Sequence, residues 1–207
     1  MSQVSGATLS VRDLEVARGE RRLFEGLDFE LASGELALVT GPNGAGKTTL
    51  MRTLAGLRLP SAGSVSFGGV PVSRIARGFT APIAFQGHLD SLKRDLTVAE
   101  NLGFSAALWG GDEQIDALAT ELDLAECLAR QVRFLSAGQR RRAALGCMRL
   151  RPASLWLLDE PLTNLDARGA DLVATWLDGH LSRGGAAVVA THQPDKLAGR
   201  AVIEVDL

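Results

Sequence analysis

The chain has 207 residues, of which 46% are hydrophobic and 22% charged, and its formal net charge is −2 at pH 7. This composition excludes general disorder and gives no electrostatic basis for binding nucleic acid. The two cysteines, Cys127 and Cys147, are too few for a disulfide framework and too far apart for a CxxC pair, which favours reduced cytosolic thiols. The N-terminus lacks the apolar region of a signal peptide and no run is long enough to span a membrane. We therefore expect a cytosolic chain that reaches a membrane only through a partner.

Hydrophobic periodicity predicts a mixture of strands and helices along the chain. In chain order these are strands 9–16, 27–31 and 35–40, helix 47–57, strands within 61–69 and 81–86, helices 96–110, 112–129 and 137–150, strand 154–161, helix 167–181 and strand 186–192. The strand over 35–40 is almost continuously apolar, as buried parallel strands are. Thr97 and Glu100 form a predicted capping box at a helix start. The pattern predicts a mainly parallel α/β core that is interrupted by a helical insert at about 88–150.

Residues 41–49 read GPNGAGKTT and match the phosphate-binding pattern G-x-x-x-x-G-K-[ST]. The pattern lies between a predicted strand and a predicted helix, which is the context it requires. Backbone N–H groups of such a loop face the phosphates, Lys47 reaches toward the β- and γ-phosphates, and the Thr48 hydroxyl can bind Mg²⁺. The alternative is a glycine-rich turn that only begins a helix. The predicted phosphate-binding residues are Gly41, Pro42, Asn43, Gly44, Ala45, Gly46, Lys47, Thr48 and Thr49.

Residues 155–161, LWLLDEP, place two carboxylates at the end of an apolar strand. A buried charge is costly unless it is paired or bound to a cation. Asp159 is therefore a candidate for the shell of a Mg²⁺ ion, and Glu160 a candidate general base for an attacking water. The alternative, a helix N-cap before Pro161, accounts for one carboxylate but not for two.

Residues 135–139, LSAGQ, are called the signature segment here and precede three arginines. Ser136 and Gln139 have the spacing of a capping box. Gly138 is unexplained by that role, because glycine in a helix costs about 1 kcal/mol relative to alanine. The glycine indicates that some other group approaches the bare backbone at this point.

The glycine-rich loop, LSAGQ, LWLLDEP, NLD (164–166) and TH (191–192), taken in this order, resemble the ATP-binding subunits of ABC transporters over essentially the whole chain. The resemblance implies an α/β fold with the P-loop NTPase (RecA-like) core, an N-terminal β part and a helical insert characteristic of this family. It implies one domain, 1–207, with its core at about 1–87 and 151–207 and its helical subdomain at about 88–150. It also implies ATP and Mg²⁺ as ligands and ATP hydrolysis coupled to transport.

In that family two cassettes pair head to tail, and the signature segment of one completes the ATP site of the other. The resemblance therefore implies an ATP-bound homodimer. Ser136 and the Gly138 backbone would meet the γ-phosphate held by the partner's Lys47, at a helix N-terminus suited to anions. Ala137 stands where the family usually has glycine. The residues carried over to this trans site are Ser136, Ala137, Gly138 and Gln139.

Three further roles come from the resemblance. His192 matches the switch histidine that contacts the γ-phosphate, and Asp166 matches the loop that communicates between the two sites. Gln86 matches the glutamine that senses Mg²⁺ and couples to the membrane partner, which makes Thr48, Gln86 and Asp159 the implied metal site. Gln86 lies 11 residues before Thr97, a longer gap than is usual, and His88 is the alternative for its role.

The family commonly stacks an aromatic side chain, often tyrosine, on adenine. This chain contains no tyrosine, and the equivalent place falls near Arg18. A guanidinium also stacks on rings, so Arg18 is the candidate, with a solvated arginine as the alternative. The arginines within 140–142 and 149–151 are expected on a solvated or partner-facing helix surface.

Within the family the motifs are most similar to the ATP-binding proteins of haem exporters used in cytochrome c biogenesis. The expected partners are then integral membrane permease subunits at the cytoplasmic face of the inner membrane, with no nucleic acid and no haem bound directly by this chain. Another ABC exporter remains an alternative. A soluble ABC ATPase acting on DNA or ribosomes would need a coiled coil or a second cassette, and a P-loop kinase would leave LSAGQ and His192 unexplained.

Overall fold

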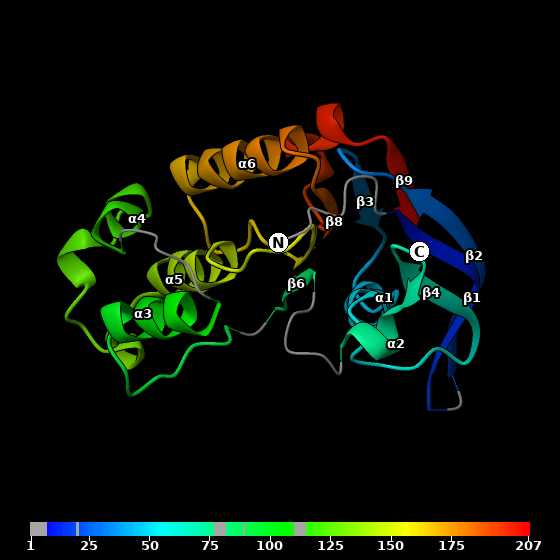
Figure 1. Ribbon diagram of the computed structural model, residues 1–207, viewed down its shortest axis with the longest axis horizontal. Coiled ribbons are helices and arrows are strands. Elements are labelled where there is room, and N and C mark those ends of the chain that lie inside the picture. Colours follow the sequence, from blue (N-terminus) through cyan, green and yellow to red (C-terminus); the bar gives the residue numbers. More distant parts are fainter. Residues whose placement is uncertain (1–7, 20, 77–81, 89, 110–114) are drawn as a thin grey trace.

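The computed structural model describes residues 8–19, 21–76, 82–88, 90–109 and 115–207. Two β-sheets and two groups of helices make up this part of the chain (Figure 1). The first sheet is antiparallel and has the order β2 (Arg21–Leu31), β1 (Leu9–Arg18), β4 (Ala62–Phe67) and β5 (Val70–Pro71). The second is parallel and has the order β6 (Ile83–Gln86), β7 (Leu155–Asp159), β8 (Ala186–Ala190), β3 (Leu36–Thr40) and β9 (Ile203–Asp206).

The parallel sheet decides where the functional residues meet. Every residue of β7 and β8 is buried, as expected of strands covered on both faces. Because the strands are parallel, their carboxyl ends lie at one edge, where open α/β sheets bind their ligands. The phosphate loop follows β3, Asp159 and Glu160 lie at the end of β7, and His192 comes shortly after β8, so the topology brings these residues to that edge.

The helices divide between the two ends of the molecule. They are α1 (Lys47–Leu54), α2 (Val72–Ile75), α3 (Val98–Trp109), α4 (Ile115–Glu121), α5 (Ala137–Arg149) and α6 (Ala167–Ser182). Short 3₁₀ turns occupy Ala125–Cys127, Val132–Phe134, Pro194–Lys196 and Ala198–Arg200. Figure 1 shows α3, α4 and α5 gathered at the end opposite the antiparallel sheet, with α1 and α2 beside that sheet.

Two hydrophobic clusters hold these parts together. One packs α3, α5 and α6 against one face of the parallel sheet through residues such as Leu102, Leu145 and Leu177. The other packs α1 between the two sheets through Leu50 and Leu54. The site edge therefore lies between the helical part and the antiparallel sheet.

The predicted helix over 112–129 is wrong in its length. Residues 112–114 lie outside the described residues, and α4 ends at Glu121. Asp123 has a φ of 56°, and the amide of Leu124 donates to the carbonyl of Ala119 at 2.7 Å. This is the left-handed helix ending of the Schellman type, which here lacks the glycine that usually indicates it.

Other local predictions are confirmed. The Thr97 hydroxyl accepts from the Glu100 amide at 3.1 Å, and the Glu100 carboxylate accepts from the Thr97 amide at 2.7 Å.

The strand β9 had no prediction. It is short and pairs only with β3 at the sheet edge, so its sequence carries little signal.

Candidate nucleotide-binding site

Residues 41–46 form a tight loop between β3 and α1. Gly41 has a φ of 130°, and a Cβ there would lie 2.6 Å from the Leu207 carbonyl. Gly46 caps α1 with a φ of 120° and lies against Leu23 and Phe24. Both positions need glycine, so the predicted backbone cradle is formed by the local geometry.

Lys47 begins α1 and its side chain lies over the loop. It is only 7% exposed, and its Nζ donates to the carbonyls of Gly41 at 2.7 Å and Pro42 at 3.3 Å. The ammonium is therefore held beside the free N–H groups at the start of the helix. Together these groups form a positively polarised site for phosphate.

A cavity of about 310 Å³ opens beside this loop. Its lining includes Arg18 and Leu23 from the antiparallel sheet, and His88, Asp159 and Glu160 from the parallel sheet. The phosphate-loop residues that line it are Asn43, Gly44, Gly46, Lys47, Thr48 and Thr49. Arg18 thus lies at the nucleotide cavity, where its predicted contact with adenine requires it, and Leu23 is a lining residue that had no prediction.

Asp159 is fully buried at the end of β7. Neither of its carboxylate oxygens has a hydrogen-bond partner in the described part of the chain. Burial raises the pKa of this carboxyl, and the negative charge of Glu160 raises it further. The nearby Thr48 hydroxyl and the charge of Arg141 lower the pKa, but burial is the largest effect. A buried carboxylate with both oxygens available, in one cavity with the Thr48 hydroxyl, fits a divalent cation such as Mg²⁺.

Glu160 and His192 meet across the ends of β7 and β8. Oε2 of Glu160 lies 2.6 Å from Nδ1 of His192 and 3.3 Å from its backbone nitrogen. Glu160 has a φ of 52°, unusual for a residue other than glycine, and its amide donates to the Ala190 carbonyl at 2.8 Å. The structure therefore brings together the predicted base and the predicted switch histidine.

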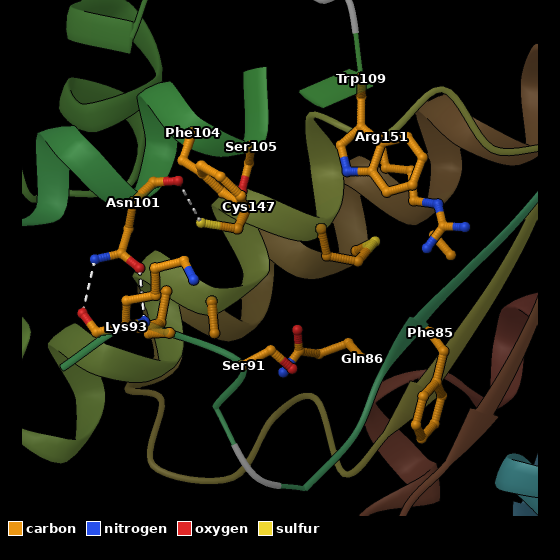
Figure 2. Close-up of a pocket in the computed structure, with 14 residues that line it drawn as sticks. Phe85, Gln86, Ser91, Lys93, Asn101, Phe104, Ser105, Trp109, Cys147 and Arg151 are labelled. Atoms are coloured by element: carbon orange, nitrogen blue, oxygen red, sulfur yellow. Dashed lines mark hydrogen bonds between the residues drawn. The ribbon is translucent and has the colours of Figure 1, made fainter. Parts of the chain in front are cut away.

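Gln86 lies away from these residues. Its side chain is 3% exposed and lines a second cavity of about 330 Å³ between β6 and the helices α3 and α5. Figure 2 shows Gln86 in this cavity together with Lys93, Asn101 and Cys147. His88, two residues later, lines the nucleotide cavity instead. The two candidates for the coupling role thus lie in different cavities.

The signature segment begins α5 as predicted. Ser136 Oγ accepts from the Gln139 amide at 3.1 Å, and the Gln139 side chain accepts from the Ser136 amide at 2.9 Å. All four residues 136–139 are described, and they are absent from the lining of this chain's own nucleotide cavity. A Cβ on Gly138 would lie 2.9 Å from the Asn164 carbonyl. The glycine at position 138 is therefore explained within the chain, because the loop that follows β7 comes too close to leave room for a side chain.

Asp166 caps α6 by accepting from the Gly169 amide at 2.9 Å. Both of its carboxylate oxygens also lie 2.9 Å from one guanidinium nitrogen of Arg142. The Gly169 amide and Arg142 hold the pKa of this carboxyl below its ordinary value. The loop before α6 is thereby attached to α5.

The expectation of a solvated or partner-facing arginine surface is wrong for Arg141, while the other arginines of these two runs are partly exposed. Arg141 is 4% exposed and donates to backbone carbonyls at the site, while Arg142 binds Asp123 and Asp166. Arg149 and Arg151 lie over the rings of Trp176 and Trp109. Successive helix residues point about 100° apart, so Arg140 and Arg142 lie on either side of the buried direction that Arg141 occupies. The motifs missed Arg141, because this spacing alone does not indicate which of the three arginines is buried.

Comparisons with known proteins agree with this geometry. The family model described as ABC transporter matches residues 24–163, more than half of the chain. The cytochrome c biogenesis ATP-binding export protein CcmA 2 of Cupriavidus metallidurans is 44% identical, over 92% of this chain and 92% of its own length. The CcmA protein of the same description from Paracoccus denitrificans is 46% identical, over 89% of this chain and 82% of its own.

A solved ATP-binding subunit of an ABC transporter superposes with a TM-score of 0.85 at 24% identity, covering 96% of this chain and 85% of that chain. This likeness confirms the fold. The family membership is shown by the family match over residues 24–163 and by relatives that align over nearly the whole chain. The chain belongs to the ABC transporter family, as an ATP-binding subunit that hydrolyses ATP to drive transport.

Proposed function

We propose that this subunit powers haem export for cytochrome c maturation, as a homodimer beneath integral membrane subunits at the cytoplasmic face of the cell membrane. The observation that carries the proposal is the shared description of the relatives, cytochrome c biogenesis ATP-binding export protein, at 44% and 46% identity over most of both chains. In the described part of the chain no helix is long and apolar enough to cross a membrane. The proposal assigns attachment to the membrane to the partner subunits, as the family resemblance implies.

Hydrolysis follows from the groups at the sheet edge. The loop amides and Lys47 bind the β- and γ-phosphates, and the Thr48 hydroxyl and the Asp159 carboxylate would hold Mg²⁺. When bound, Mg²⁺ would neutralise part of the negative charge of the phosphates. Glu160 accepts the proton of the attacking water, and His192 orients Glu160 through the 2.6 Å contact.

The coupling role divides between two residues. His88 lines the cavity that holds Lys47 and Asp159, so we assign it the nucleotide side of the role that the family resemblance gave to Gln86. Gln86 faces the second cavity, which is open to a partner. The short backbone between them then links the nucleotide to the membrane subunit.

The second cavity is the proposed docking place of a membrane subunit. Phe104, which lines it, is 52% exposed, and Leu108, one turn further along α3, is also 52% exposed. Lys93 and Arg151 are the charged residues of its lining. The occupant that fits is a segment of the permease with an apolar side chain and a neighbouring carboxylate.

Complementation in a bacterium that lacks its own subunit of this type tests the haem assignment. The wild-type chain should restore haem-stained c-type cytochromes, and Lys47→Ala should not. Purification from solubilised membranes should recover integral membrane proteins. Restored transport of another substrate without c-type cytochromes, or recovery of ribosomes or DNA, would contradict the proposal.

A further inference from the structure

Arg141 joins the signature helix to the catalytic backbone. It lies on α5, five residues after Ser136, and is 4% exposed. Its guanidinium donates to the carbonyls of three consecutive residues, Asp159 at 2.9 Å, Glu160 at 2.7 Å and Pro161 at 3.3 Å. The first two of these residues supply the buried carboxylate and the proposed base.

The same guanidinium reaches a second loop. It donates to the carbonyl of Gly87 at 3.1 Å, immediately before His88, and lies 3.9 Å from a carboxylate oxygen of Asp90. Burial lowers the pKa of Arg141, whereas the negative charges of Asp90, Asp159 and Glu160 raise it by a smaller amount. A guanidinium keeps its proton in proteins, and its planar fork can serve several acceptors at once.

The geometry of Glu160 explains why such a clamp is needed. Its φ of 52° is unfavourable for a residue with a Cβ, and such conformations persist only where surrounding contacts hold them. The flanking carbonyls of Asp159 and Glu160 both accept from Arg141. The hydrogen bonds therefore fix the backbone from which the Glu160 side chain reaches His192.

We propose that Arg141 is a positioning residue, which holds Glu160 in its catalytic orientation from the signature helix. Arg142 also binds Asp166, so the start of α5 is attached by side-chain hydrogen bonds to residues 159–161 and to Asp166. A movement of α5 would therefore also move the backbone that carries Glu160. The inference rests on Glu160 being the base, as in the proposed function, and is independent of the transported substrate.

A double-mutant cycle tests this role. Arg141→Lys keeps the charge but loses the planar fork, so the kcat of ATP hydrolysis should fall about tenfold or more while the Kd for ATP changes less than about threefold. Combined with Glu160→Gln, Arg141→Lys should lower kcat by less than about threefold further, because it acts through the base. Arg200→Lys, at an exposed ion pair with Asp178, is the matched control and should keep wild-type kcat.

The other possible results separate this inference from the proposed function. An unchanged kcat in Arg141→Lys, or a full additional loss in the Glu160→Gln background, would overturn it. Arg141→Gln serves as a second variant, and failure of both to fold would give Arg141 a role in the core alone. If Glu160→Gln keeps full activity, the proposed base is wrong. Normal kinetics without cytochrome maturation in cells would contradict only the haem assignment.

Discussion

Glu160 and His192 are 32 residues apart in sequence, yet Oε2 of one lies 2.6 Å from Nδ1 of the other. The contact joins the ends of two adjacent parallel strands, β7 and β8, whose last paired residues are Asp159 and Ala190. Glu160 is mostly buried and His192 is half exposed, with side-chain exposures of 14% and 51%. The carboxylate lines the nucleotide cavity, whereas the half-exposed imidazole that contacts it is absent from the lining of that cavity.

Replacement of Glu160 by glutamine should remove the base and preserve the shape of the site. We expect ATP binding to persist and hydrolysis to fall by 10² to 10⁴, roughly the contribution of general-base catalysis. The variant should accumulate as a nucleotide-bridged dimer, measurable by size-exclusion chromatography with MgATP. A loss of less than about tenfold would remove Glu160 from the role of base.

Lys47→Ala should abolish both ATP binding and hydrolysis. The ammonium is the one lysine charge in the nucleotide cavity of the described chain, and it also holds the carbonyls of Gly41 and Pro42. Titration with a fluorescent ATP analogue measures the loss. Lys196→Ala, at an exposed position, is the control and should bind like wild type. Near-normal affinity of Lys47→Ala would contradict the assignment of the loop.

Ser136→Arg should leave ATP binding by the monomer intact and block the closed dimer, because its bulk would occupy the place of the partner's γ-phosphate. Mixed dimers with Lys47→Ala then keep one undamaged pairing, between Lys47 of the first chain and Ser136 of the second. Labelled ATP trapped in closed mixed dimers should be found on the Ser136→Arg chain. Loss of ATP binding by the Ser136→Arg monomer would mean that the segment acts within its own chain.

Gly138→Ala should destabilise the protein despite the helix preference of alanine. The preference favours alanine by about 1 kcal/mol, but the new Cβ would lie 2.9 Å from the Asn164 carbonyl, a backbone atom. Thermal unfolding should show a lower midpoint, with reduced hydrolysis. Gly179→Ala on α6 is the matched control, since its Cβ would meet only the flexible end of Arg183 and should raise the midpoint. If both substitutions raised the midpoint equally, the Asn164 carbonyl would be able to move away from the new Cβ at little cost.

His180 should make the protein sensitive to acid. Its ring stacks on Trp156 with centroids 4.0 Å apart, and burial lowers its pKa from 6.5 to about 4. Because the folded pKa lies below the unfolded one, the unfolded state binds the proton first, and stability falls as the pH drops from 6.5 toward 4. Between pH 7 and pH 5 the loss is about 2 kcal/mol.

Urea unfolding at pH 7 and pH 5 measures this effect. His180→Gln keeps a side-chain donor for the Ala186 carbonyl, which accepts from Nε2 at 3.1 Å in the wild type, but it does not titrate. The variant should be less stable at pH 7 and show a smaller loss at pH 5. An equal pH dependence in both proteins would assign the acid sensitivity to the carboxylates.

Motifs with local causes were predictable. The phosphate loop depends on glycines and a lysine within nine residues, and the capping boxes at Thr97 and Ser136 close over three residues. Their hydrogen bonds are made inside the segment that encodes them, so the sequence carries the complete information. The ordered set of motifs likewise indicated the family that the comparisons confirm.

Roles that depend on distant contacts were decided by the tertiary structure. Gln86 and His88 differ by two residues, and only the packing of β6 beside α3 and α5 places them in different cavities. The edge strand β9 exists because β3 offers it hydrogen bonds. Arg141 is buried because the carbonyls of residues 159–161 replace the water that an arginine otherwise requires. Local patterns determined which chemical groups the chain carries, and the burial and pairing of remote segments determined which of them meet.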